Sequence, residues 1–221
     1  AQVAARLAMV YLMNRKPERA ISALRTTRIG DLAGEIRQQR LLLEARAQSD
    51  IGRHELALDI ITNVSGREAV RLRSDIYWAS RRWRESAEQI ELLYGDRWRD
   101  FQPLSTSEKS DIIRAAIGYA LAEDAIGLSR FREKYNAKMD GNDREAFDLA
   151  SKPATANSVD FARIAKMAAS IDTLDGFLRE MKTRFPDAMA RAKLPPAIKA
   201  DPNPTGALPA IRGLKPVAAK R

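Results

Sequence analysis

The chain has 221 residues, of which 45% are hydrophobic and 30% charged, a composition typical of globular proteins with a proper core. It contains no cysteine, which excludes disulfides, thiolate catalysis and cysteine-ligated zinc. It also lacks the uninterrupted apolar run of ~18–20 residues that a transmembrane helix needs.

The net charge of +9 is unevenly distributed along the chain. Residues 1–100 hold 18 basic and 14 acidic residues, residues 101–185 hold 13 of each, and residues 186–221 hold seven basic and two acidic residues. Of the 18 basic residues in the first hundred, 17 are arginine. A GC-rich genome explains this bias more simply than selection for guanidinium groups that pair with carboxylates or phosphates.

The chain does not begin with methionine, and its opening segment AQVAARLAMVYL already has a helical pattern. We therefore expect a piece of a longer protein, with any targeting segment upstream. The sequence leaves the compartment open between cytoplasm and periplasm.

Apolar residues recur at three- and four-residue spacing along most of the chain, and strand-like alternation is absent. The clearest segments are ARLAMVYLM, RLLLEARAQ, VRLRSDIYWA, SAEQIELLY, DIIRAAIGYALA and FARIAKMAASI. Residues that start or stop helices separate them: Pro17, Gly30, Gly52, Gly95 and the capping box from Ser105 to Glu108. Helices joined by such short breaks must be antiparallel neighbours. The sequence therefore predicts an all-α fold built of helical hairpins.

Three of these hairpins align with one another on a small residue. The segments YLMNRKPERAISAL, SDIGRHELALDII and ASRRWRESAEQI superimpose on Ala20, Ala57 and Ser86, which are 37 and 29 residues apart. Two helix axes approach to about 8–10 Å only where the contact residues are small. We therefore expect these residues at the crossing points, and expect Trp83 to fill space beside Ser86.

The aligned segments resemble the tetratricopeptide repeat family, whose unit is a helix–turn–helix of 34 residues. The matching positions are Leu7, Ala8, Tyr11, Ala20 and Leu24; Ala45, Gly52, Ala57 and Ile61; and Tyr77, Trp83, Ser86 and Ile90. The departures are the absence of the usual glycine beside the first helix in all three segments, Gln48 in place of the aromatic residue, Arg15 and Arg81 at the turn glycine, and an irregular spacing. The resemblance covers roughly residues 1–95 and implies a right-handed α-solenoid of antiparallel hairpins.

We expect residues 96–185 to form degenerate helical pairs that close the solenoid. Trp98 and Phe101 should pin a connector to the body, and Asn142 or Asp143 should cap a helix over 143–151. A final pair is expected at 158–171 and 173–185, with Ser158 and Asp172 as caps. Residues 186–221 contain seven prolines, which no helix can run through, so this segment is predicted to be an extended basic tail.

No catalytic residue, cofactor or metal site is predicted. The chain contains no GxxxxGK[ST], GxGxxG, HExxH or GxSxG. The segment at 140–151 starts like a calcium loop, but Arg144, Glu145 and Ser151 stand where ligands and a glycine are needed. His54 is the only histidine and is interpreted as structural, and Glu123 with Asp124 as a solvated helix end.

In the resembled family, the first helix of each unit lines a concave groove that takes peptides or partner helices. Carried over by position, the groove residues are Met9, Leu12, Gln39, Leu42, Arg46, Arg71, Asp75 and Trp78. Ala5 and Met9 stand where some members have a Lys and Asn clamp for a terminal carboxylate, so that clamp is not expected. A mixed apolar and arginine groove suits a segment with acidic residues.

These observations favour a non-catalytic protein–protein interaction scaffold. One alternative is binding of nucleic acid or an anionic surface through the basic tail and the arginine-rich faces, although residues 101–185 are neutral and the tail lacks a dense basic run. Another is an accessory domain of an enzyme whose catalytic part lies outside this chain. The tail, which contains ALPAIRGLKPV, is also a candidate to fill the chain's own groove. The partner's identity and the oligomeric state stay open.

Overall fold

The chain forms helices joined by turns and loops over the part that the computed structural model describes, which is residues 2–27, 34–152, 154–156 and 158–186. This confirms the predicted all-α class. No strand occurs within these ranges, and none of their helices is long and apolar enough to cross a membrane. The predicted helix end at Gly30 and all but the first residue of the predicted tail lie outside the described ranges.

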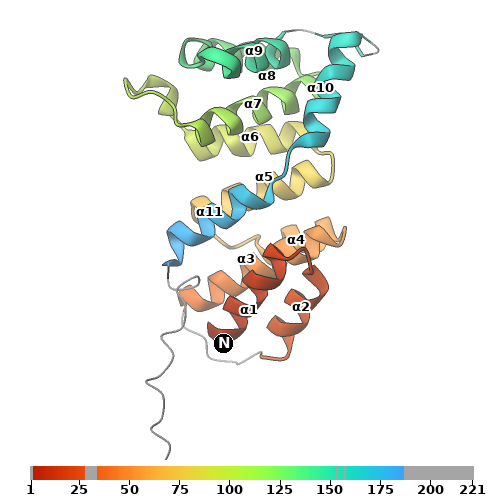
Figure 1. Cartoon of the computed structure of the whole chain (residues 1–221), viewed down its shortest axis with the longest axis vertical. Coiled ribbons are helices and arrows are strands. Elements are labelled where there is room, and N and C mark those ends of the chain that lie inside the picture. Colours follow the sequence, from red (N-terminus) through yellow and green to blue (C-terminus); the bar gives the residue numbers. More distant parts are fainter. Residues whose placement is uncertain (1, 28–33, 153, 157, 187–221) are drawn as a thin grey trace, which may run out of the picture. The chain divides into compact units, whose positions relative to one another are not determined.

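Eight helices form four pairs, and the two helices of each pair are consecutive in the chain (Figure 1). The pairs are α1 (Gln2–Met13) with α2 (Pro17–Arg25), α3 (Gly34–Asp50) with α4 (His54–Ile60), α5 (Arg67–Ala79) with α6 (Trp83–Tyr94), and α7 (Thr106–Leu121) with α8 (Ala125–Tyr135). The second helix of each of the first three pairs also packs against the first helix of the next pair. Neighbouring hairpins therefore bury one another's apolar faces.

The four turns within these pairs share one backbone geometry. The middle residue of each turn has a positive φ, which is 55° at Arg15, 82° at Gly52, 58° at Arg81 and 54° at Glu123. In each turn the next amide donates to a carbonyl five residues earlier, as Lys16 N does to Tyr11 O at 2.9 Å. This bond is typical of a Schellman helix ending, in which glycine is the usual left-handed residue. Three of the four turns accept a larger side chain there.

The small residues that define the sequence repeat are buried. Ala20, Ala57 and Ser86 are 0%, 0% and 1% exposed. The two hydroxyls of Ser74 and Ser86 each donate to the other residue's carbonyl at 2.9 Å, which brings α5 and α6 together at this point. Trp83, three residues earlier, stacks edge-on against Trp78 with ring centroids 4.9 Å apart. These positions are part of the packing, as predicted.

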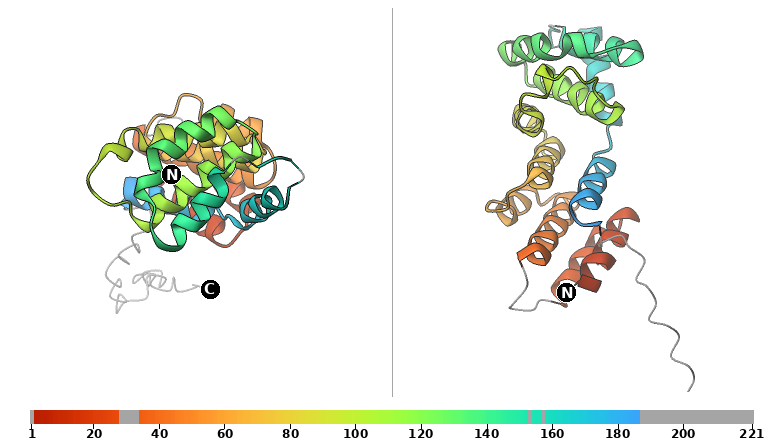
Figure 2. Two further views of the ribbon diagram at one scale, coloured as in Figure 1. Left: turned by 90° about the horizontal axis from the view of Figure 1, so that it is seen from above. Right: turned by 90° about the vertical axis from the view of Figure 1, so that its left-hand side faces the viewer.

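The last three α-helices pack on different parts of the molecule (Figures 1 and 2). α9 (Gly141–Ser151) lies on α7 and α8, and α10 (Val159–Ser170) on α7 and α9. α11 (Leu174–Arg184) instead packs along α5. The predicted pairing of the last two helices is therefore wrong, because the chain is extended at Ile171 and α11 buries its apolar stripe elsewhere.

Several predicted helix starts are confirmed. Pro17 begins α2, and the capping box forms: Glu108 N donates to Ser105 Oγ at 3.3 Å, and Ser105 N donates to Glu108 Oε2 at 2.7 Å. Ser158 accepts from the amide of Phe161.

Two other local predictions fail. Neither Asn142 nor Asp143 caps α9, because that helix already begins at Gly141, after an extended Asp140 whose side chain makes no capping bond. Phe101 is fully exposed and does not pin the connector. Trp98, in the short 3-10 helix η1 (Arg97–Arg99), is partly buried against the core, as expected.

Two apolar cores divide the helical body between them. The first joins the hairpins of α1 to α4 with α5 and α11, and is mostly aliphatic. The second joins α6 to α10 and includes Tyr119, Phe131, Tyr135 and Phe147. The second 3-10 helix, η2 (Asn136–Lys138), follows α8 directly.

Candidate helix-binding groove

The eight residues predicted to line a groove come from the first helices of three successive hairpins. Met9 and Leu12 lie on α1, Gln39, Leu42 and Arg46 on α3, and Arg71, Asp75 and Trp78 on α5. All eight are buried, with exposed fractions between 0% and 8%. The face that they form is therefore covered.

α11 covers this face. Its apolar residues Leu174, Phe177, Leu178 and Met181 recur at helical spacing and are buried in the same core as Met9, Leu12 and Leu42. Gln39 lines a small recess together with Arg184 and Phe185, at the end of α11. The structure thus brings the apolar groove residues together under a helix of the same chain.

The predicted groove residue Arg46 binds the beginning of α11. Its Nη1 donates to Thr173 Oγ1 at 3.2 Å, and its guanidinium carbon lies 5.6 Å from the centroid of the Phe177 ring. Its Nε donates to Asp50 at 2.9 Å, which holds the guanidinium in place. Arg46 therefore supports α11 by a hydrogen bond and by ring contact together.

Arg71 meets the middle of α11. Its Nε lies 3.6 Å from Glu180 Oε1. A Cβ atom on Gly176 would stand only 2.7 Å from Arg71 Nη1, so a larger residue here would require the guanidinium of Arg71 to move. At the far end of α11, Arg184 pairs with Glu35 at 3.0 Å.

A buried ion network lies beneath α11. Asp111 accepts from both Nη atoms of Arg71 and, at 2.5 Å, from the hydroxyl of Tyr94. Burial by itself lowers the pKa of Arg71, but the carboxylates of Asp111 and Asp75 raise it above its usual value. Burial and the Asp111 charge likewise raise the pKa of Tyr94, so Arg71 stays charged and Tyr94 neutral across the ordinary pH range.

The second part of this network is centred on Asp75. Its Oδ1 accepts from Arg114 Nη1 at 2.7 Å, and its Oδ2 lies 3.6 Å from Arg46 Nη1. Arg114 also lies over the Trp78 ring, 5.8 Å from its centroid. Trp78 belongs to the second core rather than to the first, so it does not take part in the apolar contact with α11.

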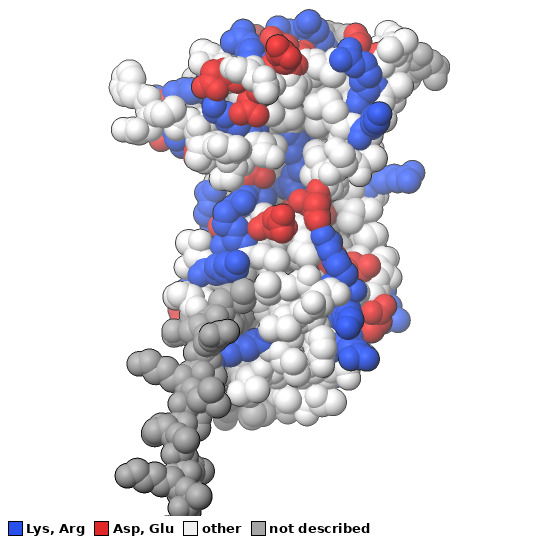
Figure 3. Space-filling model, in the orientation of Figure 1, with Lys and Arg blue, Asp and Glu red and all other residues white. Residues whose placement is uncertain are grey.

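Side chains of both signs gather over α5 and α11 on the face seen in Figure 3. A cavity of about 440 Å³ opens there, lined among others by Arg71, Arg114 and Arg179 and by Asp111, Asp172 and Asp175. The three arginines and three aspartates of its lining have opposite charges that sum to zero. The cavity can therefore accept either hydrogen-bond donors or acceptors.

The sequence reasoning missed four residues of this site: Asp111, Arg114, Gly176 and Glu180. Arg114 had a visible signal, because it is the only charged residue within the apolar run IIRAAIGYALA at 112–122. A charge in such a run is buried with its helix and needs a partner. Gly176 and Glu180 carried no comparable signal, since their role depends on where α11 docks.

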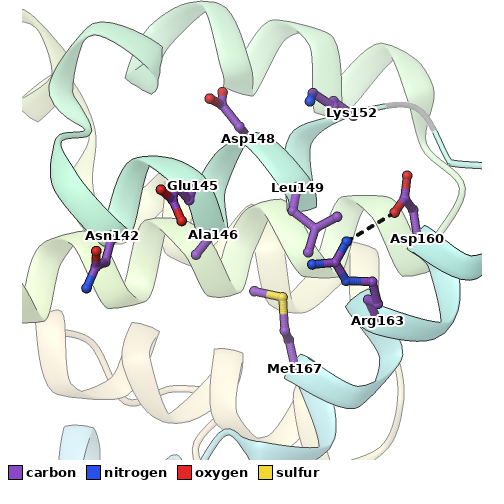
Figure 4. Close-up of a pocket in the computed structure, with 9 residues that line it drawn as sticks. All are labelled: Asn142, Glu145, Ala146, Asp148, Leu149, Lys152, Asp160, Arg163 and Met167. Atoms are coloured by element: carbon purple, nitrogen blue, oxygen red, sulfur yellow. Dashed lines mark ion pairs between the residues drawn. The ribbon is translucent and has the colours of Figure 1, made fainter.

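Other candidate residues lie away from this groove. A recess of about 650 Å³ between α9 and α10 (Figure 4) is lined by residues of both signs, including Glu145, Asp148 and Lys152. Asp160 and Arg163, also in its lining, form an ion pair at 3.6 Å. His54 begins α4, with its Nδ1 3.2 Å from Ser49 Oγ. Within the described residues, no group of three His, Asp or Glu side chains is placed to hold a metal ion.

Comparison of the chain with protein-family models, with curated proteins and with solved structures gave no match.

Proposed function

We propose that this protein is a non-catalytic interaction scaffold, a right-handed α-solenoid of tetratricopeptide-like hairpins with a proline-rich tail. The recurrence of one turn geometry at Arg15, Gly52, Arg81 and Glu123 supports a repeat architecture. So does the packing of each second helix on the following hairpin. The groove of this scaffold binds one helix of a partner protein.

The position of α11 against the predicted groove residues is the observation that supports this proposal. Residues selected from the sequence as a helix-binding groove lie against an amphipathic helix of the same chain. Their contacts with α11 define a preferred ligand: apolar residues at i, i+3, i+4 and i+7, a glycine opposite Arg71, and an acidic residue four positions later. Within the chain, α11 occupies the place of that ligand.

Pairing of the arginines favours a protein partner over nucleic acid. Arg46 and Arg71 are buried in ion pairs with carboxylates of the same chain. The exposed Arg84 and the partly buried Arg97 also have acidic partners, at 3.0 and 2.9 Å. Cations already held by carboxylates contribute less to the phosphate contacts that dominate nucleic-acid binding.

The experiment is a binding measurement with the α11 segment itself. A fluorescein-labelled peptide of residues 172–186 is titrated with the full chain, with Phe177→Ala and with Lys182→Ala, and anisotropy is recorded. Phe177 is fully buried, so its truncation weakens the packing of α11 on the rest of the chain by roughly 3–5 kcal/mol. Phe177→Ala protein should then bind the wild-type peptide at least roughly tenfold more tightly than the wild-type chain does.

Lys182 is exposed on α11, so Lys182→Ala should bind like the wild-type chain. A peptide that itself carries Phe177→Ala should bind to none of the proteins. If Phe177→Ala protein keeps its helical circular dichroism and still fails to bind the wild-type peptide, the face does not accept a helix from solution. The scaffold proposal is then wrong in its central feature.

A further inference from the structure

The outer face of α1 is apolar and open to solvent. Val3, Leu7, Val10 and Met13 are 77%, 42%, 48% and 46% exposed. The first three lie within a sector of about 60° around the helix axis, because successive residues are about 100° apart. None of them belongs to the groove residues. The other large exposed apolar side chains, such as Phe101 and Ile126, are scattered over different elements.

The positions equivalent to Val10 and Val3 in the other three hairpins are buried. Counting back from the positive-φ turn residue, Val10 corresponds to Ala47, Ile76 and Gly118, all of which are buried. Val3 corresponds to Arg40, Ala69 and Asp111, which are 7%, 0% and 7% exposed. The same side of the first helix is thus interior in three hairpins and surface in one.

The second helix of the preceding hairpin covers this side. A Cβ atom on Gly118 of α7 would stand 2.8 Å from the carbonyl oxygen of Trp83 and 3.3 Å from Ala87 Cβ, both on α6. Arg40 of α3 donates to the carbonyl of Leu24 on α2.

The position of Leu7 varies more among the other hairpins, where its equivalents are Glu44, Arg73 and Ala115. Ala115 is 1% exposed. Arg73 of α5 is partly buried and donates to the carbonyls of Ile61 and Val64 at 3.0 and 2.6 Å, immediately after α4. Among these four positions, only that of α1 has a large apolar side chain exposed to solvent.

The opposite end of the hairpin series is closed differently. α9 packs on α7 and α8, and the outward face of α8 carries Ser129, Arg130 and Glu133, with Ile126 as its one large exposed apolar side chain. A polar outer face is what a terminal repeat unit needs to stay in solution. By this criterion α8 and α9 form an end, and α1 does not.

We propose that the outer face of α1 is a docking surface for the second helix of a further helical hairpin, of the kind formed by α2, α4 and α6. The occupant presents apolar and small residues to Val3, Leu7 and Val10, as the preceding helix does to Ile76 and Gly118. α1 contains no acidic residue and one arginine, so the contact is apolar rather than ionic. This surface goes beyond the proposed groove function and is separate from the groove.

The test adds such a hairpin and measures protection of the face. Because the chain has no cysteine, Val10→Cys provides a single thiol on the surface, and its reaction with a maleimide reports exposure. Residues 34–66, which contain α3, α4 and the linker that normally leads into α5, are placed directly before Ala1, so that Val3 follows Gly66 by three residues, as Ala69 does. This hairpin is the matched probe, since α5 presents Ala69, Arg73 and Ile76 where α1 presents Val3, Leu7 and Val10.

We expect the thiol at position 10 to react at least roughly tenfold more slowly in the fusion than in the unfused chain. Glu18→Cys is the matched control. Glu18 corresponds to Arg84, which stays exposed although the preceding hairpin is present. Its thiol should therefore react equally fast in both proteins. In a fusion that also carries Val3→Asp and Leu7→Asp, protection at position 10 should disappear.

Two results would overturn the proposal. One is equal reactivity at position 10 in both proteins when circular dichroism shows that the added hairpin is helical. The other is a concentration-dependent dimer of the unfused chain in sedimentation velocity that Leu7→Asp abolishes, because the occupant would then be a second copy of α1. Neither result affects the peptide titration that tests the groove.

Discussion

In the first three hairpins, the fifth residue after the turn residue is Ala20, Ala57 or Ser86, whereas the fourth hairpin has Leu128 there. All four positions are buried. In the fourth hairpin the two helices come close at Gly127 instead, where a Cβ atom would stand 3.0 Å from the ring of Tyr119. The same turn can therefore join helix pairs that differ in how their side chains meet.

Aromatic side chains accompany this change. Phe131 lies 5.6, 4.9 and 6.4 Å from the ring centroids of Tyr119, Tyr135 and Phe147. The first core has no such cluster and relies on alanine contacts and aliphatic side chains. Where small residues keep two helices close, little space needs filling. Where a leucine separates them, large rings fill the space.

The largest expected effect is at the centre of the aromatic cluster. Phe131→Ala should lower the free energy of unfolding by about 3–5 kcal/mol, because a fully buried ring is replaced by a cavity. Urea denaturation followed by circular dichroism measures this change. Phe101→Ala, at a fully exposed ring, should alter stability by less than about 0.5 kcal/mol. A loss at Phe131 as small as that at Phe101 would mean that the second core is loosely packed.

A larger residue at a small-residue contact should cost less, but still measurably. Ala57→Leu should lower the free energy of unfolding by about 1–3 kcal/mol, because the added atoms must push α3 and α4 apart. The neighbouring Leu56 is 42% exposed, so Leu56→Ala is the control and should be close to neutral. If Ala57→Leu proves neutral as well, the first hairpins tolerate the arrangement of the fourth, and the contrast between the two regions loses its physical basis.

The smallest effects are expected at the shared turns. Gly52→Ala should destabilise by about 1 kcal/mol, because φ is 82° there and a Cβ atom is unfavourable in the left-handed region. At Arg81, with φ of 58° and an exposed side chain, Arg81→Gly should be neutral or stabilise by up to about 0.5 kcal/mol, since relief of strain competes with greater freedom of the unfolded chain. Thermal denaturation of both variants compares them. Opposite signs to those expected would show that the turns are not equivalent.

Local features were predictable because their causes are local. The capping box at Ser105 and Glu108, the helix start at Pro17 and the buried residues Ala20, Ala57 and Ser86 follow from spacing along a few turns of helix. The predictions failed where two residues a few positions apart could each have begun the helix or held the connector. Asp140 rather than Asn142 precedes α9, and the connector is held by Trp98 rather than by Phe101.

The predicted groove residues lie close together, but their role as a groove stays a prediction. Six of the eight, excepting Gln39 and Trp78, lie in the first core or in the ion network beneath α11. The partners Asp111 and Arg114 come from a fourth helix about 40 residues away in the chain. Such a pairing depends on how the hairpins pack against one another. A short stretch of sequence does not contain that information.

Helical periodicity, turn residues and the recurrence of small side chains determined that this chain forms all-α hairpins, because each acts between residues a few positions apart. The same periodicity marks 174–184 as an amphipathic helix, but it does not say against which surface the apolar stripe is buried. That surface was decided by the tertiary structure. The stacked first helices offer an apolar face with Arg46 and Arg71 at its edge, and Leu174, Phe177, Leu178 and Met181 leave water only by docking there.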